Sequence, residues 1–162
     1  MRSLPPNRTT WVLLAYRLPR VPSTPRSALW RKLRRLGAAQ VLDGLAALPL
    51  DARNREQLEW LAEEVVEAGG EVTIWVGELT SAGQERELAS RMAEAIAADY
   101  RALIDDATAA QGEMPGQRRR TLGRLRRELR RIRARDFFPP PELELAQHAV
   151  EEVAALVEEP VG

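Results

Sequence analysis

The sequence of 162 residues contains no cysteine and a single histidine, His148. Without cysteine the chain can form no disulfide, supply no thiolate ligand and use no thiol nucleophile. One histidine excludes most arrangements of zinc ligands. The glycine-rich patterns of dinucleotide-binding and phosphate-binding loops are also missing. We therefore expect a protein that is not an enzyme and that has neither a metal nor a cofactor.

Long apolar runs are missing as well. No stretch reaches the roughly 18 apolar residues that suggest a membrane-spanning helix. The first ten residues, MRSLPPNRTT, lack the apolar centre and small-residue cleavage site of a signal peptide. We expect a cytoplasmic protein with no membrane partner.

Charged residues are abundant, and they are segregated along the chain. The formal net charge is zero, with 24 Lys and Arg against 24 Asp and Glu. Residues 1–42 carry nine basic residues and no acid, whereas residues 117–136 carry ten arginines against two acids. Local charge, rather than net charge, decides which surfaces attract anions. Each basic block therefore either binds a polyanion or an oxyanion, or is neutralised by an acidic neighbour in the fold.

The first half of the chain alternates between strand and helix patterns. Four short apolar or β-branched runs predict strands, and two stretches with apolar residues at helical spacing predict helices. Asp43-Gly44 is a strong signal for a two-residue hairpin turn, and Asn54 is a plausible N-cap. The order β-α-β-β-α-β predicts an α+β protein with a ferredoxin-like βαββαβ domain over residues 9–79. A helical extension is predicted over residues 80–162, with helices at about 81–109, 117–135 and 142–158.

Two segments of this chain are distinctive, namely WVLLAYRLPRVPSTPRSALWRKLRRLGAAQVLDGLAALP and NREQLEWLAEEVVEAGGEVTIWV. Together they resemble the N-terminal domain of the ChrB family of chromate-resistance regulators. The resemblance implies a regulator of a chromate-export operon that acts on DNA and responds to chromate. Typical members carry a second, C-terminal domain associated with sensing the oxyanion, and this chain is expected to lack it. At the level of the fold, the α/β part is also similar to the central domain of phenylacetate-pathway repressors and to small CRISPR-associated nucleases.

A metal-dependent nuclease is the least favoured function. Such an enzyme needs a carboxylate at the end of the first strand to hold a divalent metal. Here that place is occupied by Tyr16-Arg17-Leu18-Pro19, and no acid precedes Asp43. The turn geometry alone explains an Asp-Gly pair at that position.

The first basic block offers candidate anion ligands, because arginine presents a charged planar fork of donors that suits phosphate and tetrahedral oxyanions. Three arginines surround the predicted strand–loop–helix junction, and four basic residues follow on the helix. Trp30 lies one turn before Arg34 and could pack beneath its guanidinium. The alternative is a solvated helix face whose tryptophan anchors the core. The candidates are Arg17, Arg20, Arg26, Arg31, Lys32, Arg34 and Arg35.

The second basic block falls on the predicted helix 117–135. Its candidate phosphate ligands are Arg119, Arg120, Arg126, Arg127 and Arg130. The alternative is a helical hairpin in which the acidic helix 142–158, or the helix 81–109, neutralises much of the charge. The sequence leaves both interpretations open.

Two main hypotheses follow. The first is a DNA-binding transcription regulator of a chromate-resistance operon that acts as a homodimer, because the edge strands of a four-stranded sheet need covering. The second is an oxyanion-binding or protein-interaction module, for chromate or a similar oxyanion, that needs a partner for DNA contact.

Overall fold

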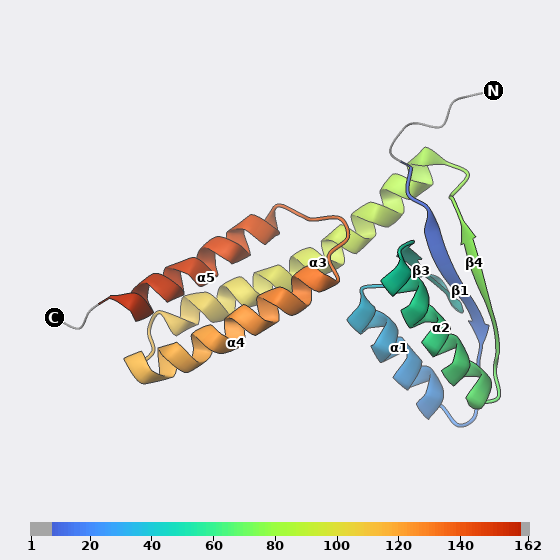
Figure 1. Cartoon of the computed structure of the whole chain (residues 1–162), viewed down its shortest axis with the longest axis horizontal. Coiled ribbons are helices and arrows are strands. Elements are labelled where there is room, and N and C mark those ends of the chain that lie inside the picture. Colours follow the sequence, from blue (N-terminus) through green and yellow to red (C-terminus); the bar gives the residue numbers. More distant parts are fainter. Residues whose placement is uncertain (1–7, 160–162) are drawn as a thin grey trace. The chain divides into compact units, whose positions relative to one another are not determined.

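The computed structural model describes residues 8–159, so the prediction made for the first ten residues falls largely outside them. The chain forms two compact units, one up to Met92 and the other from Ala93 onward. Figure 1 shows the elements in chain order from blue to red. Each unit is described by itself.

The first unit contains one four-stranded antiparallel sheet. The strands are β1 (Trp11–Arg17), β2 (Ala39–Leu42), β3 (Leu45–Pro49) and β4 (Glu71–Gly77). Their order across the sheet is β2-β3-β1-β4, and every neighbouring pair is antiparallel. The apolar run of β1 therefore lies at the centre of the sheet, and the α+β prediction is confirmed.

Two helices, α1 (Thr24–Leu36) and α2 (Ala52–Glu67), lie side by side against the sheet (Figure 1). Leu29 and Leu33 of α1 are buried, and so are Leu58 and Val65 of α2. These side chains recur at helical spacing, so burying them turns the polar positions of both helices toward solvent. The basic residues of α1 are on the surface for this reason.

The hairpin between β2 and β3 turns at Asp43-Gly44, as predicted. Gly44 has a φ of 97°, and a Cβ atom there would lie 2.5 Å from the carbonyl oxygen of Tyr16. Gly44 also accepts a hydrogen bond of 2.8 Å from the Tyr16 amide. The turn is thereby fixed against the end of β1, and a side chain at this position would push it away.

The prediction that Asn54 caps α2 is wrong. The N-cap is Asp51, in an extended conformation, and its side chain accepts a 2.6 Å hydrogen bond from the Asn54 amide. Asn54 is buried and donates from its side-chain amide to the carbonyl of Pro49 at 2.8 Å. Asp and Asn are both good caps, and Asp51, which is closer to the end of β3, takes the N-cap position.

The second unit is a bundle of three helices, which Figure 1 shows running alongside one another. They are α3 (Ala82–Ala110), α4 (Pro115–Ala134) and α5 (Glu142–Glu158). One buried cluster joins them, and it includes Tyr100, Leu103, Leu125, Ile132 and Val153. The helix α4 begins at Pro115 rather than at 117, because proline fits the first turn of a helix, where its missing N–H has no partner to lose.

The division between the units falls inside α3, whereas the sequence suggested residue 79. The first turns of α3 are tied to the first unit by polar contacts. Glu85 accepts a 2.8 Å hydrogen bond from the Thr9 amide and pairs with Arg8, while Arg91 donates to the carbonyl of Gln40. Within the described part of the chain, no helix is long and apolar enough to cross a membrane.

Candidate anion-binding surfaces

A cleft of about 800 Å³ opens in the first unit between α1 and the ends of β1 and β2. Its α1 wall presents two arginines, two serines and an aromatic ring, and its strand wall presents a tyrosine hydroxyl. Gln40 and Asp43 complete the strand side. The lining of the cleft includes Tyr16, Ser23, Arg26, Ser27, Trp30 and Arg31.

The junction arginines of the first block have different environments. Arg26 lines the cleft and donates to the carbonyl of Arg20 at 3.3 Å, while the Arg20 side chain is exposed. Arg17 also lines the cleft, but its guanidinium pairs with Glu71 of β4. The register of β1 and β4 places those two residues opposite each other. Arg17 is therefore already partnered.

The basic residues of α1 are also divided. Arg31 lines the cleft, and no ion pair involves it within residues 8–159. Lys32 is bound to both carboxylate oxygens of Glu64, at 2.7 and 2.8 Å. Arg35 lines a separate groove between α1 and α2, together with Lys32 and Trp60. Within residues 8–159, only Arg26 and Arg31 therefore present guanidinium groups to the cleft without a carboxylate partner.

The guanidinium of Arg34 lies over the Trp30 ring, 5.0 Å from its centroid. The predicted contact is confirmed. Trp30 retains 51% of its surface exposed, so the alternative in which it anchors the core is wrong. An indole held in place by a guanidinium on the wall of a cleft offers a rigid aromatic surface.

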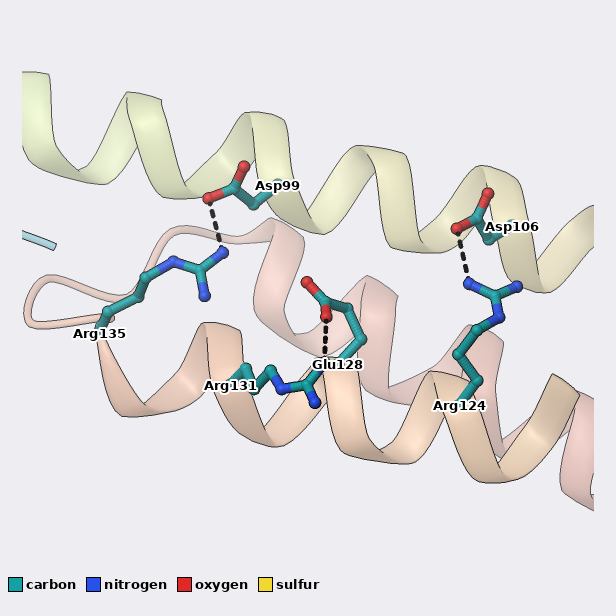
Figure 2. Close-up of polar contacts among 6 residues, drawn as sticks. All are labelled: Asp99, Asp106, Arg124, Glu128, Arg131 and Arg135. Carbon is teal, nitrogen blue, oxygen red and sulfur yellow. Dashed lines mark hydrogen bonds and ion pairs between the residues drawn. The ribbon is translucent and has the colours of Figure 1, made fainter. Parts of the chain in front are cut away.

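On α4, some arginines are neutralised by acids of α3. Arg124 lies 3.4 Å from Asp106 and Arg135 lies 3.1 Å from Asp99. Figure 2 shows both pairs. Arg131 pairs with Glu128 on its own helix. The hypothesis of neutralisation is correct for this side of α4.

Arg118 is partly buried at the junction of α3 and α4. Its guanidinium donates to the carbonyls of Ala110, Gln111 and Glu113 at 3.2, 2.8 and 2.8 Å. The last carbonyls of a helix have no partner within it, so a cation at this position satisfies the end of α3 and favours its dipole. Arg118 therefore connects α3 to α4.

The remaining arginines of α4 are exposed, and none makes an ion pair within the described chain. Four of them recur at positions i, i+7, i+11 and i+14, which at about 100° per residue lie within about 60° of one another. We call Arg119, Arg126, Arg130 and Arg133 the α4 arginine row. The row is about 21 Å long at 1.5 Å per residue. Arg127 lies beside it, and Arg120 donates to Gln117 at 2.9 Å.

Arg133 is not among the residues predicted from the sequence, although it follows Arg119 by fourteen residues. The carboxylates of α5 do not take part in the neutralisation. Glu142 pairs with Arg101 of α3 and Glu152 with His148, and no ion pair joins α4 to α5 within residues 8–159. The row is consequently free of charge partners along its whole length in the described structure.

A buried hydrogen bond fixes the end of α4. The hydroxyl of Tyr100, which is fully buried, donates to Asp136 at 2.7 Å. Burial, then the hydrogen bond and charge of Asp136, raise the pKa of Tyr100 well above its ordinary value. The tyrosine therefore stays protonated and keeps the chain after α4 attached to α3, next to the last arginine of the row.

Comparison with known protein families identifies the family of this chain. The family model described as "Protein ChrB, N-terminal" matches residues 26–160, which is most of the sequence. The chain belongs to the ChrB family. A curated ChrB protein from Cupriavidus metallidurans is 34% identical over 109 residues, which is 67% of this chain and 30% of that protein. The match thus spans less than a third of the relative's length. No solved structure matches, and the similarity to phenylacetate-pathway repressors stays a prediction.

Proposed function

We propose that this ChrB-family chain is a non-enzymatic regulatory protein of chromate resistance that binds DNA through the α4 arginine row. The observation that carries the proposal is the absence of charge partners for these four exposed arginines within residues 8–159. Neighbouring arginines on the same helix are paired with acids of α3. The row is the longest unneutralised cationic surface that we identify.

The dimensions of the row suit a nucleic-acid backbone. Each DNA strand carries one phosphate per about 3.4 Å of helix axis, so a 21 Å row lies alongside roughly six phosphates of one strand. Contacts of this kind supply affinity and fix position, but they do not read bases. Sequence-specific recognition would need a second copy of the chain or another protein.

The experiment compares two sets of variants on one helix. Duplex DNA binding is measured by fluorescence anisotropy over a range of KCl concentrations. We expect alanine at all four positions of the row to weaken binding on the order of a hundredfold at low salt. The salt slope should fall by about 3 to 4, since each phosphate contact contributes about 0.9.

The matched control is the double variant Arg124→Ala and Arg131→Ala, which removes two arginines that already have carboxylate partners. It should change binding only slightly. Equal loss in both variants, or no binding by the parent protein at low salt, would contradict the proposal.

We propose a homodimer as the DNA-binding form. The strand β4 is an edge of the sheet, and Trp75 and Val76 on it are 62% and 50% exposed. An exposed apolar strand at the edge of a sheet can pair with a strand of another chain. Sedimentation equilibrium should report a dimer that Trp75→Lys shifts toward monomer; a monomeric parent at all concentrations would contradict this.

The proposal includes a ferredoxin-like assignment for the sheet and its two helices. The element order β1-α1-β2-β3-α2-β4 and the strand order β2-β3-β1-β4 support it. An experimental structure with a different strand order would overturn it.

The second candidate function is oxyanion binding in the cleft, which Arg26 and Arg31 favour because they face it without carboxylate partners within the described residues. A rise in the melting temperature with sulfate or chromate, and none with chloride at equal ionic strength, would support this candidate. Loss of the rise in Arg26→Ala/Arg31→Ala would locate the anion in the cleft.

A further inference from the structure

The size of the cleft exceeds what an inorganic oxyanion needs. A water molecule occupies about 30 Å³ in the liquid, and a tetrahedral oxyanion takes up only a few times that volume. The cleft holds about 800 Å³, which is within the range of pockets for organic ligands. The cleft therefore has room for a larger molecule in which the anion bound by Arg26 and Arg31 is one group.

The rest of the cleft indicates what that molecule carries. Trp30 lines the cleft with half its surface exposed, and Arg34 holds its ring. Trp30 follows Arg26 by four residues, so the two side chains are neighbours on one face of α1, and Arg31 lines the same cleft. This arrangement favours a planar ring joined to an anionic group.

The opposite wall supplies directional hydrogen bonds. Gln40 donates to the hydroxyl oxygen of Tyr16 at 3.0 Å, which leaves the phenolic proton available to a ligand. On the α1 side, Ser23 at the N-cap position and Ser27 within the helix line the same cleft. Asp43, at the hairpin turn, offers a carboxylate that accepts hydrogen bonds from sugar hydroxyls or from amino groups of a base.

We propose that the cleft binds a free nucleotide, with its base stacked on Trp30 and its phosphate bound by Arg26 and Arg31. Aromatic stacking tolerates any base, because every base has a π face. Selectivity among bases would depend on Tyr16, Gln40 and Asp43. The site deepens the second candidate function by naming its ligand, and it does not depend on DNA binding by the α4 arginine row.

The test titrates the full chain by calorimetry with AMP, GMP, ribose 5-phosphate and sulfate. AMP or GMP should bind at least tenfold more tightly than ribose 5-phosphate or sulfate, because only the nucleotides can stack. Trp30→Ala should reduce nucleotide affinity to the level of ribose 5-phosphate and leave the binding of ribose 5-phosphate unchanged. Arg26→Ala/Arg31→Ala should abolish the binding of all four.

Two controls separate this site from the other surfaces. Trp60→Ala removes an exposed tryptophan that lines the other groove of the first unit, and it should leave nucleotide affinity unchanged. The variant that lacks the α4 arginine row should also bind AMP normally, so failure of the DNA proposal is distinguishable from failure of this one.

Three results would overturn the inference. The first is equal affinity for AMP and sulfate, which makes the cleft a simple anion site. The second is unchanged nucleotide binding in Trp30→Ala when its thermal unfolding matches that of the parent. The third is binding of a single-stranded oligonucleotide through Trp30 without binding of free AMP or GMP, which would make the ligand a nucleic-acid strand.

Discussion

The two basic helices differ in how their charges are used. On α1, the cations are distributed among a cleft, a carboxylate of α2 and an aromatic ring, as Arg31, Lys32 and Arg34 show. On α4, one side is paired with α3, and the α4 arginine row has no charge partner within residues 8–159. Two blocks of similar composition thus form surfaces of different kinds. The packing of the neighbouring helix, more than the local charge count, decides which arginines remain available.

The largest expected effect is a loss of stability that is confined to the second unit. Leu125 is fully buried in the three-helix core, so Leu125→Ala should destabilise the second unit by about 2–5 kcal/mol through lost burial and a residual cavity. Urea denaturation followed by circular dichroism measures this loss. Nucleotide binding in the first unit should persist at urea concentrations that abolish DNA binding. Loss of nucleotide binding and DNA binding at the same urea concentration would contradict the prediction that the two units unfold independently.

Arg118→Ala tests whether an arginine of α4 can be structural rather than functional. It removes one hydrogen bond to the last carbonyl of α3, that of Ala110, and two to carbonyls of the loop that follows. A hydrogen bond from a charged group is worth about 1.5–3 kcal/mol. We expect the variant to lose about 1.5–3 kcal/mol of unfolding free energy. Its DNA affinity should change little under conditions in which it is folded. A large loss of DNA affinity in a fully folded variant would place Arg118 with the row.

The stability of the second unit should fall at alkaline pH, because Tyr100 is buried and donates a hydrogen bond to Asp136. The folded-state pKa is raised above the ordinary value of 10.0, so the stabilisation is complete below pH 10 and is lost progressively as the pH rises above that value. Tyr100→Phe should cost about 1 kcal/mol at neutral pH, because Asp136 loses its donor. Its unfolding free energy should also fall less steeply than that of the parent above pH 10. Parallel pH profiles for the two proteins would contradict this.

The smallest effect concerns α1. Lys32 and Glu64 are both partly exposed, and such ion pairs contribute only about 0–1 kcal/mol. Lys32→Ala should therefore change the melting temperature little, and DNA affinity should also stay close to that of the parent because Lys32 is already neutralised. Thermal unfolding and anisotropy measure the two quantities. A DNA affinity loss as large as that of the row variant would remove the distinction between the two helices.

Features that depend on local spacing could be predicted from the sequence. The contact between Trp30 and Arg34 follows from their separation of four residues, and the turn at Gly44 follows from the need for a positive φ. The buried faces of α4 and α5 follow from their apolar periodicity. The N-cap of α2 was placed wrongly because Asp51 and Asn54 have similar capping propensity, and only the end of β3 distinguishes them.

The pairing of arginines depends on contacts that the sequence does not specify. Arg17 meets Glu71 through the register of β1 and β4, which requires the whole sheet. Arg135 and Asp99 are 36 residues apart and meet because of the rotation of two packed helices. For this reason the arginines of the second basic block could be counted from the sequence, but the carboxylate partners of Arg124, Arg131 and Arg135 required the structure.

The separation of charge on the second unit has a practical consequence for purification. The α4 arginine row is cationic, while Glu144, Glu151 and Glu158 of α5 are exposed and have no ion pair within residues 8–159. A chain with a formal net charge of zero would thus bind both heparin and anion-exchange resin at low salt. The proposed DNA binding by the row further predicts that cellular nucleic acid copurifies with the chain at low salt and is removed by a high-salt wash.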